Sequence, residues 1–185
     1  MRYVLMVVAC ALMSSPALAQ HQGFYLGLGF GQSDAKDACN GAAAFGLMCD
    51  DSDTATKFFA GYQFNRNLAV EAGYTDLGRA RFTGPGGSID FESTGFEVMA
   101  VGIAPLGPQA WLYGKAGIFF WDLDVSFVGL SESGTELTYG FGVGFDFTRN
   151  FAARFEYQVY PDIGDDFTTG TSDVAVLGVN LIFRF

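Results

Sequence analysis

Apolar and polar residues alternate with a period of two along six segments of this chain. One face of each segment is apolar and often aromatic, while the positions between carry glycine or polar residues such as Gly27 and Gln158. Period-two alternation is typical of β-strands whose two faces meet different surroundings. The pattern therefore predicts strands over residues 24–30, 58–64, 68–74, 139–147, 151–159 and 175–185.

Two further segments alternate less regularly, at about 91–105 and 109–127. In the second of these, Trp111, Tyr113 and Lys115 share one face. In the first, Glu97 falls on the expected polar face. With these two segments the prediction is an all-β protein of eight strands.

The two faces decide the class of barrel. An eight-stranded barrel is only wide enough inside to hold side chains, and the apolar face carries too many rings to fit there. A soluble surface made of glycines and a few charges, among them Glu71 and Asp146, is equally unsuitable. Turning the apolar face outward to lipid removes both difficulties. The expected fold is an eight-stranded antiparallel up-and-down transmembrane β-barrel.

The connections support this fold because short and long ones alternate along the chain. The short ones are 65–67, 105–109 and 148–150, and the long ones are roughly 34–55, 77–90, 125–136 and 161–172. Outer-membrane barrels have short periplasmic turns and longer external loops. Aromatic residues near the strand ends suit an interfacial girdle; they are Phe64, Phe147, Phe151, Phe183 and Phe185.

Residues 1–19 have the pattern of a secretory signal peptide. Arg2 precedes an apolar stretch from Val4 to Met13, and Ala17-Leu18-Ala19 fits the cleavage pattern. The stretch is too short for a membrane-spanning helix. A lipoprotein site at Cys10 is the alternative, but Cys10 lies too early, inside the apolar stretch. We therefore expect export and a barrel domain over residues 20–185.

Composition narrows the function classes. The chain of 185 residues has 20 acidic against 10 basic residues and a formal net charge of −10. Nucleic-acid binding needs basic patches, so no nucleic-acid partner is expected. The 25 glycines and 16% aromatic residues suit strands that alternate small and bulky side chains better than helices, in which glycine is costly.

Two cysteines follow the leader, Cys39 and Cys49, in the first long connection. An exported chain with two nearby cysteines favours an intramolecular disulfide. Zinc needs additional ligands that are lacking here, so no metal site is expected. We predict that this pair staples the loop.

Candidate chemistry outside the strands is weak. The single histidine, His21, lies outside every predicted strand, so a serine–histidine arrangement is lacking and neither catalysis nor a cofactor is expected. Acidic residues gather in the long connections, for example at Asp50–Asp53 and Asp162–Asp166. They could bind calcium or share divalent ions with lipopolysaccharide, but their spacing fits no defined calcium loop. Solvated charge is the favoured interpretation.

Three stretches carry a family resemblance. They are GFGVGFDFTRNFAARFEYQVYPDIGD at 140–165, AGYQFNRNLAVEAGYTDLG at 60–78, and the final VAVLGVNLIFRF. The sequence resembles the N-terminal barrel of the outer-membrane protein A family. This resemblance implies a Gram-negative outer-membrane location and contact with lipid and lipopolysaccharide. It also implies that Phe183 and Phe185 form the signal read by the barrel-assembly machinery.

Family barrels keep an interior cluster of acids and bases that blocks or gates the lumen. The resemblance places Glu71, Asp146 and Arg154 in this cluster, with Lys115 as a further base and Glu156 as a pairing partner. The family's lysine on the fourth strand corresponds to Val101, which puts gating in doubt. Many members continue into a peptidoglycan-binding domain, but this sequence stops at Phe185, so tethering to the cell wall is not carried over.

Two function classes follow for a monomeric barrel. The first is a structural component of the outer membrane with a narrow lumen, which the interior charges either plug or gate for small solutes. The second is a surface adhesin that acts through its external loops. Passage of hydrophobic molecules through a lateral opening is less compatible with the polar interior face.

Overall fold

The computed structural model describes residues 22–35, 48–50, 52–84, 87–125, 130–165 and 170–185. Its secondary structure there consists of strands, and no helix in these ranges is long and apolar enough to span a membrane. The strands are β1 (Gly23–Ala35), β2 (Met48–Asp50), β3 (Ser52–Gln63), β4 (Leu68–Gly84), β5 (Gly87–Pro105), β6 (Ala110–Val125), β7 (Leu130–Asp146), β8 (Phe151–Asp165) and β9 (Gly170–Arg184).

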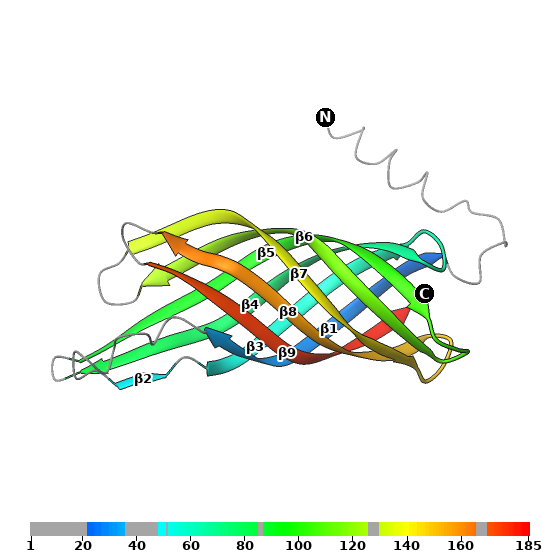
Figure 1. The fold of residues 1–185 in the computed structure, drawn as a ribbon, viewed down its shortest axis with the longest axis horizontal. Coiled ribbons are helices and arrows are strands. Elements are labelled where there is room, and N and C mark those ends of the chain that lie inside the picture. Colours follow the sequence, from blue (N-terminus) through cyan, green and yellow to red (C-terminus); the bar gives the residue numbers. More distant parts are fainter. Residues whose placement is uncertain (1–21, 36–47, 51, 85–86, 126–129, 166–169) are drawn as a thin grey trace, which may run out of the picture.

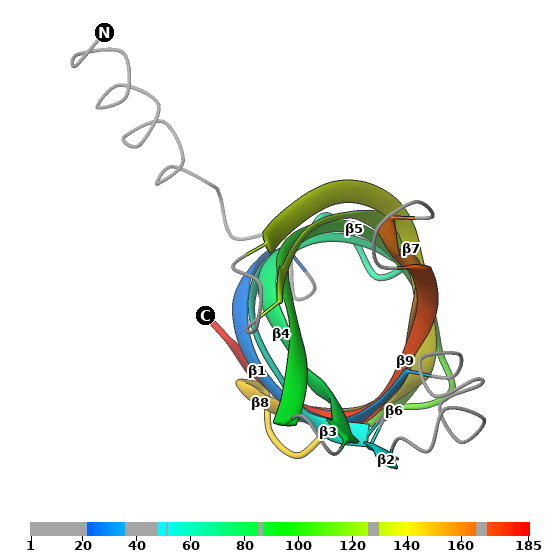
Figure 2. The same cartoon turned by 90° about the vertical axis from the view of Figure 1, so that its left-hand side faces the viewer.

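The eight long strands close into an antiparallel barrel, as predicted. Each pairs with its neighbour along the chain, β1 pairs with β9, and β4 pairs with β5 to complete the ring. The short strand β2 is an addition that pairs with the outer end of β4. Figures 1 and 2 show the tilted strands and the closed ring, with the C-terminus at the short-turn end.

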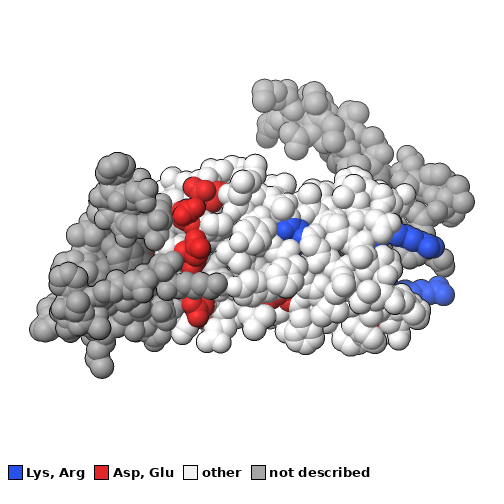
Figure 3. Space-filling view, viewed as in Figure 1, with Lys and Arg blue, Asp and Glu red and all other residues white. Residues whose placement is uncertain are grey.

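The assignment of the two faces is confirmed. Apolar side chains of the alternating segments point outward, with half or more of the surface exposed for Phe24, Phe141 and Phe155. Polar side chains on the opposite face, such as Glu71 and Arg154, are 1–2% exposed and lie inside. Figure 3 shows a belt that is white apart from one small blue and one small red patch, with acidic residues gathered toward the long-loop end and basic residues at the other.

Strands β5 and β6 alternate poorly in sequence because both of their faces carry bulky side chains. Met99 and Val101 of β5 are 0% and 1% exposed, and Phe119 and Trp121 of β6 are also buried. These side chains fill the lumen, while Phe96 on the same β5 strand faces outward. Because bulky residues lie on both faces, these two strands lack the clear period-two alternation of apolar and polar residues that the other strands show.

The long connections are shorter than the sequence predicts. Strands β4 and β5 continue to Gly84 and from Gly87, and strand β7 already begins at Leu130. Strands β8 and β9 likewise extend into the range assigned to the last long loop, to Asp165 and from Gly170. In these extensions each strand stays paired with at least one neighbour. The apolar alternation ends there because no lipid covers the outward face.

Inward glycines make room for inward rings. A Cβ atom at Gly27 would overlap the ring of Phe59, one at Gly61 would overlap Tyr25, and one at Gly144 would overlap Trp111. Rings of this kind cover glycines on the neighbouring strand and bury the exposed backbone. Small and large residues therefore alternate around the lumen, which lets a narrow barrel hold several aromatic side chains.

Aromatic contacts gather at the short-turn end on the outer surface. The rings of Phe151 and Phe183 lie 5.0 Å apart, and those of Phe183 and Phe185 lie 5.1 Å apart. The backbone N–H of Phe185 donates to the carbonyl of Phe24 at 3.1 Å, which ties the last residue to β1. This arrangement matches the aromatic girdle expected at a membrane interface.

Candidate functional site: a charge network in the lumen

The first part of the site is an ion pair that crosses the lumen. Arg154 of β8 meets Glu71 of β4 through two bonds, Nη1 to Oε1 at 2.6 Å and Nη2 to Oε2 at 2.9 Å. The hydroxyl of Tyr25 also donates to Glu71 at 2.8 Å. The Arg154 guanidinium lies 4.5 Å from the ring centre of Phe59 and 4.9 Å from that of Tyr113. Bidentate pairing and two aromatic faces hold this arginine rigidly.

Glu156 connects this pair to the rest of the network. It is two residues after Arg154 on β8 and therefore faces the same way. Its carboxylate lies 2.7 Å from Lys115 Nζ and 3.3 Å from Arg154 Nη2, and it accepts a hydrogen bond from the Tyr113 hydroxyl at 2.7 Å. Lys57 Nζ lies 3.4 Å away. Glu156 thus touches all three interior bases.

A second ion pair completes the network toward the long-loop end. Lys57 of β3 lies 3.0 Å from Glu97 of β5, and its ammonium group also donates to the side-chain oxygen of Gln158. Glu97 accepts from Gln158 Nε2 and from the Tyr160 hydroxyl, each at 3.0 Å. Gln158 and Tyr160 continue the inward row of β8.

The network is electrically balanced. It contains three carboxylates and three cationic groups, and each of these side chains is at most 9% exposed; they are Lys57, Glu71, Glu97, Lys115, Arg154 and Glu156. An unpaired buried charge costs several kcal/mol, so neutrality is what makes this interior tolerable. Every carboxylate contacts at least one base. Removal of any one member leaves an uncompensated charge.

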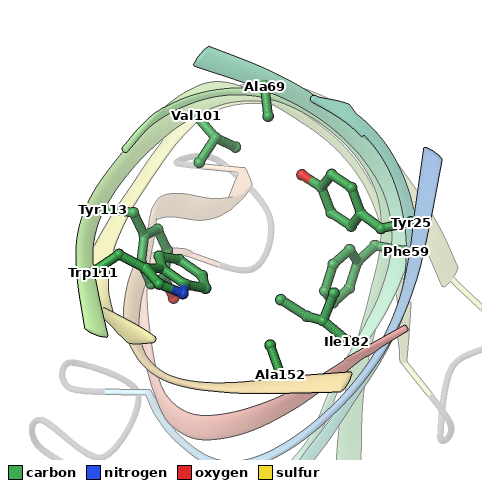
Figure 4. Packing of buried hydrophobic residues seen from close by; sticks show 8 residues of the cluster. All are labelled: Tyr25, Phe59, Ala69, Val101, Trp111, Tyr113, Ala152 and Ile182. Carbon is green, nitrogen blue, oxygen red and sulfur yellow. The ribbon is translucent and has the colours of Figure 1, made fainter. Parts of the chain in front are cut away.

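Apolar layers lie on both sides of the charges. Toward the short turns, one buried cluster contains Tyr25, Phe59, Ala69, Val101, Trp111, Tyr113, Ala152 and Ile182 (Figure 4). Toward the long loops, another contains Leu77, Phe119, Trp121, Leu123, Tyr160, Ile163 and Val174. A cavity of about 20 Å³ beside Lys57 and Glu156 has room for about one water molecule. The described side chains of the lumen are therefore stacked in three layers, with the charges between two apolar clusters.

The structure brings together four of the five interior residues named from the sequence. Glu71, Arg154, Glu156 and Lys115 form a continuous chain of ion pairs in that order. Asp146 does not join them. It lies near the short-turn end, where it accepts from Arg184 at 2.6 Å and from the Trp111 indole at 3.2 Å.

Sequence reasoning missed Lys57 as a network member. Lys57 directly precedes Phe58 and therefore falls on the polar face of β3, which was the available signal. Glu97 was assigned to the polar face but not to the cluster. At the position of the family's fourth-strand lysine, Val101 packs in the apolar cluster at 1% exposure. The third base of the network comes from β3 instead.

The remaining predicted features fall largely outside the described residues. Residues 1–21 contain the expected signal peptide, and Cys39 lies in the undescribed range 36–47. The disulfide between Cys39 and Cys49 therefore stays a prediction. Phe183 and Phe185 lie on the outer surface at the end of the barrel, 37% and 73% exposed, where they could be read by another protein.

Among curated proteins, similar relatives are outer membrane proteins A. The protein from Klebsiella pneumoniae is 32% identical over 69% of this chain, and that from Yersinia pseudotuberculosis is 29% identical over the whole chain. The matches cover 40% and 56% of those proteins. The chain therefore spans about half the length of the curated relatives it matches.

Among solved structures, the fold is similar to that of small outer-membrane barrels. Neisserial surface protein A has a TM-score of 0.64 at 19% identity, covering 88% of this chain and 97% of that one. The attachment invasion locus protein Ail of Yersinia pestis, in complex with a heparin analogue, has a TM-score of 0.57 at 20% identity, covering 89% and 99%.

A family model gives the assignment. The model for the OmpA-like transmembrane domain matches residues 19–185, which include every strand of the barrel. Together with the outward apolar belt, this match places the protein in the outer membrane of a Gram-negative cell. The chain belongs to the family of OmpA-like transmembrane domains.

Proposed function

We propose that this protein is a structural component of the outer membrane, a barrel anchored in lipid whose lumen is sealed by the balanced charge network. The observation that supports this proposal is the stacking of buried side chains through the interior. Six paired charges occupy its middle, and an apolar cluster lies on each side of them. A barrel filled in this way contributes rigidity and surface to the membrane rather than an open path.

Envelope integrity tests this structural role. In a strain that lacks the gene, we expect greater sensitivity to detergents and greater entry of a large dye, both restored by the wild-type chain. A variant in which Leu28 is replaced by lysine serves as the control, because it weakens the lipid-facing belt and leaves the lumen intact. Unchanged envelope integrity in the deletion strain would contradict the structural role.

A narrow pore for small solutes is the finer possibility at the same site. Because Arg154 is bound by both Glu71 and Glu156, an exchange of partners is geometrically available without moving a strand. The flanking apolar clusters would also have to yield before ions could pass. A small residual conductance that changes in Arg154→Ala would support this pore. If no conductance is measured, the charged residues of the lumen act as a plug.

A role as an adhesin is the second candidate function, and it rests on the acidic outer end of the barrel. Ail was solved with a sulfated sugar, a polyanion. Here the described side chains at the long-loop end include Asp53, Asp122 and Asp173 as well as Arg79, so this surface suits a cationic partner better than a polyanion. Exchange of the external loops followed by cell-binding assays separates the two functions, since adhesion would be lost while the barrel stays folded.

The C-terminal strand supports recognition during assembly. Phe183 and Phe185 are exposed on the outside of the barrel, and we infer that the barrel-assembly machinery reads them. Replacement of Phe185 by alanine should lower the amount of folded protein in the outer membrane without changing refolding of the purified chain into detergent. Equal loss in both assays would point to stability instead. We expect the assembled barrel to be a monomer in contact with lipid and lipopolysaccharide.

A further inference from the structure

The barrel wall opens along two seams toward the long-loop end of the strands. The pairing of β3 with β4 ends at Thr56 and Asp76, and that of β7 with β8 ends at Tyr139 and Val159, although all four strands continue outward. The other neighbouring pairs stay joined. The outer wall therefore consists of two four-stranded sheets, β4-β5-β6-β7 and β8-β9-β1-β3.

The first seam is occupied by groups of this chain. Asp53 accepts the backbone N–H groups of Thr54 at 2.7 Å and of Arg79 at 2.9 Å. Asp76 accepts the N–H of Gly78 at 2.8 Å, where Gly78 adopts a positive φ of 81°. Farther out, β2 adds to the edge of β4 over residues 81–83. Edge strands left open invite pairing with other chains, and this one is covered.

The second seam has a chemical cause. If β7 and β8 stayed in register, the next hydrogen-bonded pair after Tyr139 and Val159 would be Leu137 and Pro161, and proline has no N–H to donate. Val159 is the last residue of β8 that pairs with β7, and its carbonyl accepts the hydroxyl of Thr138 at 2.8 Å. Beyond this point the register of β8 shifts, and Asp162 has a φ of 52°. Strand β8 thus leaves β7.

Backbone alternation shows which groups of β7 are left at the seam. The N–H of Asp146 points to the β6 side, where it donates to Gln109, while the N–H of Phe147 donates to Phe151 of β8. The N–H and C=O of one residue in an antiparallel strand point to the same side, and sides alternate. The register of β7 with β6 is continuous. The odd-numbered Ser133, Thr135 and Leu137 therefore direct their backbone groups away from β6.

We propose that this segment, residues 133–137 of β7, binds an extended strand of a partner protein by β-strand addition. No described strand pairs with this side of it. The side chains of Ser133, Thr135 and Leu137 are exposed, and Leu137 is 71% exposed. The segment lacks the lysine or proline that usually protects an open edge. Strand β2 on β4 is an example of the same addition within this molecule.

Charge defines the chemistry of the partner strand. Asp122 lies opposite Ser133 on β6, Glu136 belongs to the segment, and Asp162 and Asp173 lie on the sheet across the seam. Among the described residues of β6–β9, the cationic side chains lie in the lumen or at the short-turn end. A strand with lysine or arginine at alternate positions is therefore complementary to this surface. Because the surface lies outside the lumen, this inference does not depend on the sealed-lumen proposal.

Binding of a labelled peptide of alternating lysine and threonine to the full chain in lipid nanodiscs tests the inference. We expect saturable binding that weakens by about tenfold or more in Thr135→Pro, because proline removes one N–H that faces the seam and places its ring at the strand edge. Thr135→Val keeps the N–H and should bind like the wild type. Ser133→Pro provides a second edge variant should Thr135→Pro fail to fold.

A peptide with the same charge but methylated backbone nitrogens separates strand pairing from simple attraction. We expect this peptide to bind much more weakly than its unmethylated counterpart. Amide hydrogen exchange gives an independent measurement: Thr135 and Leu137 should exchange faster than Glu136 and Thr138, and addition of the peptide should slow them. Equal binding of both peptides, equal binding to the proline variants, or absence of binding would each overturn the proposal.

Discussion

Arg154 and Glu71 form a bidentate ion pair across the lumen although they are 83 residues apart in the chain. Each side chain is 1–2% exposed, so neither can exchange its partner for bulk water. The pair ties β8 to β4 through the centre of the barrel.

Breaking this pair on one side should be costly. In Arg154→Met, Glu71 keeps the Tyr25 hydroxyl but loses its cation, and we expect a loss of about 3–5 kcal/mol in unfolding free energy. The double variant Glu71→Leu with Arg154→Met should recover most of that loss, because no charge then stays unpaired. Urea unfolding in lipid vesicles, followed by tryptophan fluorescence, measures both. Additive losses in the double variant would contradict the account.

The pair of Lys57 and Glu97 should behave in the same way. Lys57→Met leaves Glu97 with only neutral donors at hydrogen-bond distance, Gln158 and Tyr160, and should cost about 3–5 kcal/mol. Adding Glu97→Gln restores neutrality at this end of the network and should return part of the stability. A Lys57→Met protein as stable as the wild type would mean that Lys57 is not a true member of the network.

Inward and outward glycines should differ in their tolerance of a methyl group. Gly61→Ala forces the Tyr25 ring to move, and with it a hydroxyl that binds Glu71, so we expect a loss of about 1–3 kcal/mol. Gly114 has only a backbone oxygen, 4.0 Å from the added atom, so Gly114→Ala should be nearly neutral. The comparison uses the same unfolding assay, and equal effects would argue against the inside-out arrangement.

The lipid belt can be mapped along a single strand. Leu28 and Gln32 of β1 both point outward, but Leu28 lies among apolar neighbours and Gln32 lies beyond them. Leu28→Lys should cost about 2–4 kcal/mol, as lysine does near the middle of a bilayer, whereas Gln32→Lys should cost about 0–1 kcal/mol. Similar costs at the two positions would mean that the belt is wider than proposed.

Much of the fold could be predicted from the sequence because the period of a strand is strict. The side chains of successive residues such as Phe141 and Gly142 point to opposite faces of a strand whatever surrounds them. In a membrane, the face that contacts lipid is then the apolar one. The outer extensions of β4, β5 and β7 could not be predicted, since outside the lipid nothing requires the outward face of a strand to be apolar. Pro161 marks where β8 separates from β7, but its effect depends on a register that only the structure provides.

The site was less predictable than the fold for a similar reason. A face assignment says that Glu71, Lys115 and Asp146 point inward, but not at which height each of them lies. The strand tilt sets that height, and it places Asp146 beside Arg184 rather than beside Arg154. Lys57 comes from β3, two strands away from Glu97 on β5, and the pattern of a single strand could not associate the two residues.

Single-channel recording of the purified, refolded chain in a planar bilayer tests the sealed lumen most directly. We expect folded wild-type protein to show no steady conductance, and removal of a blocking pair in Glu71→Ala or Arg154→Ala to produce brief openings. A large, steady conductance in the wild type, unchanged in both variants, would contradict the account, because the paired charges could not then be what closes the barrel.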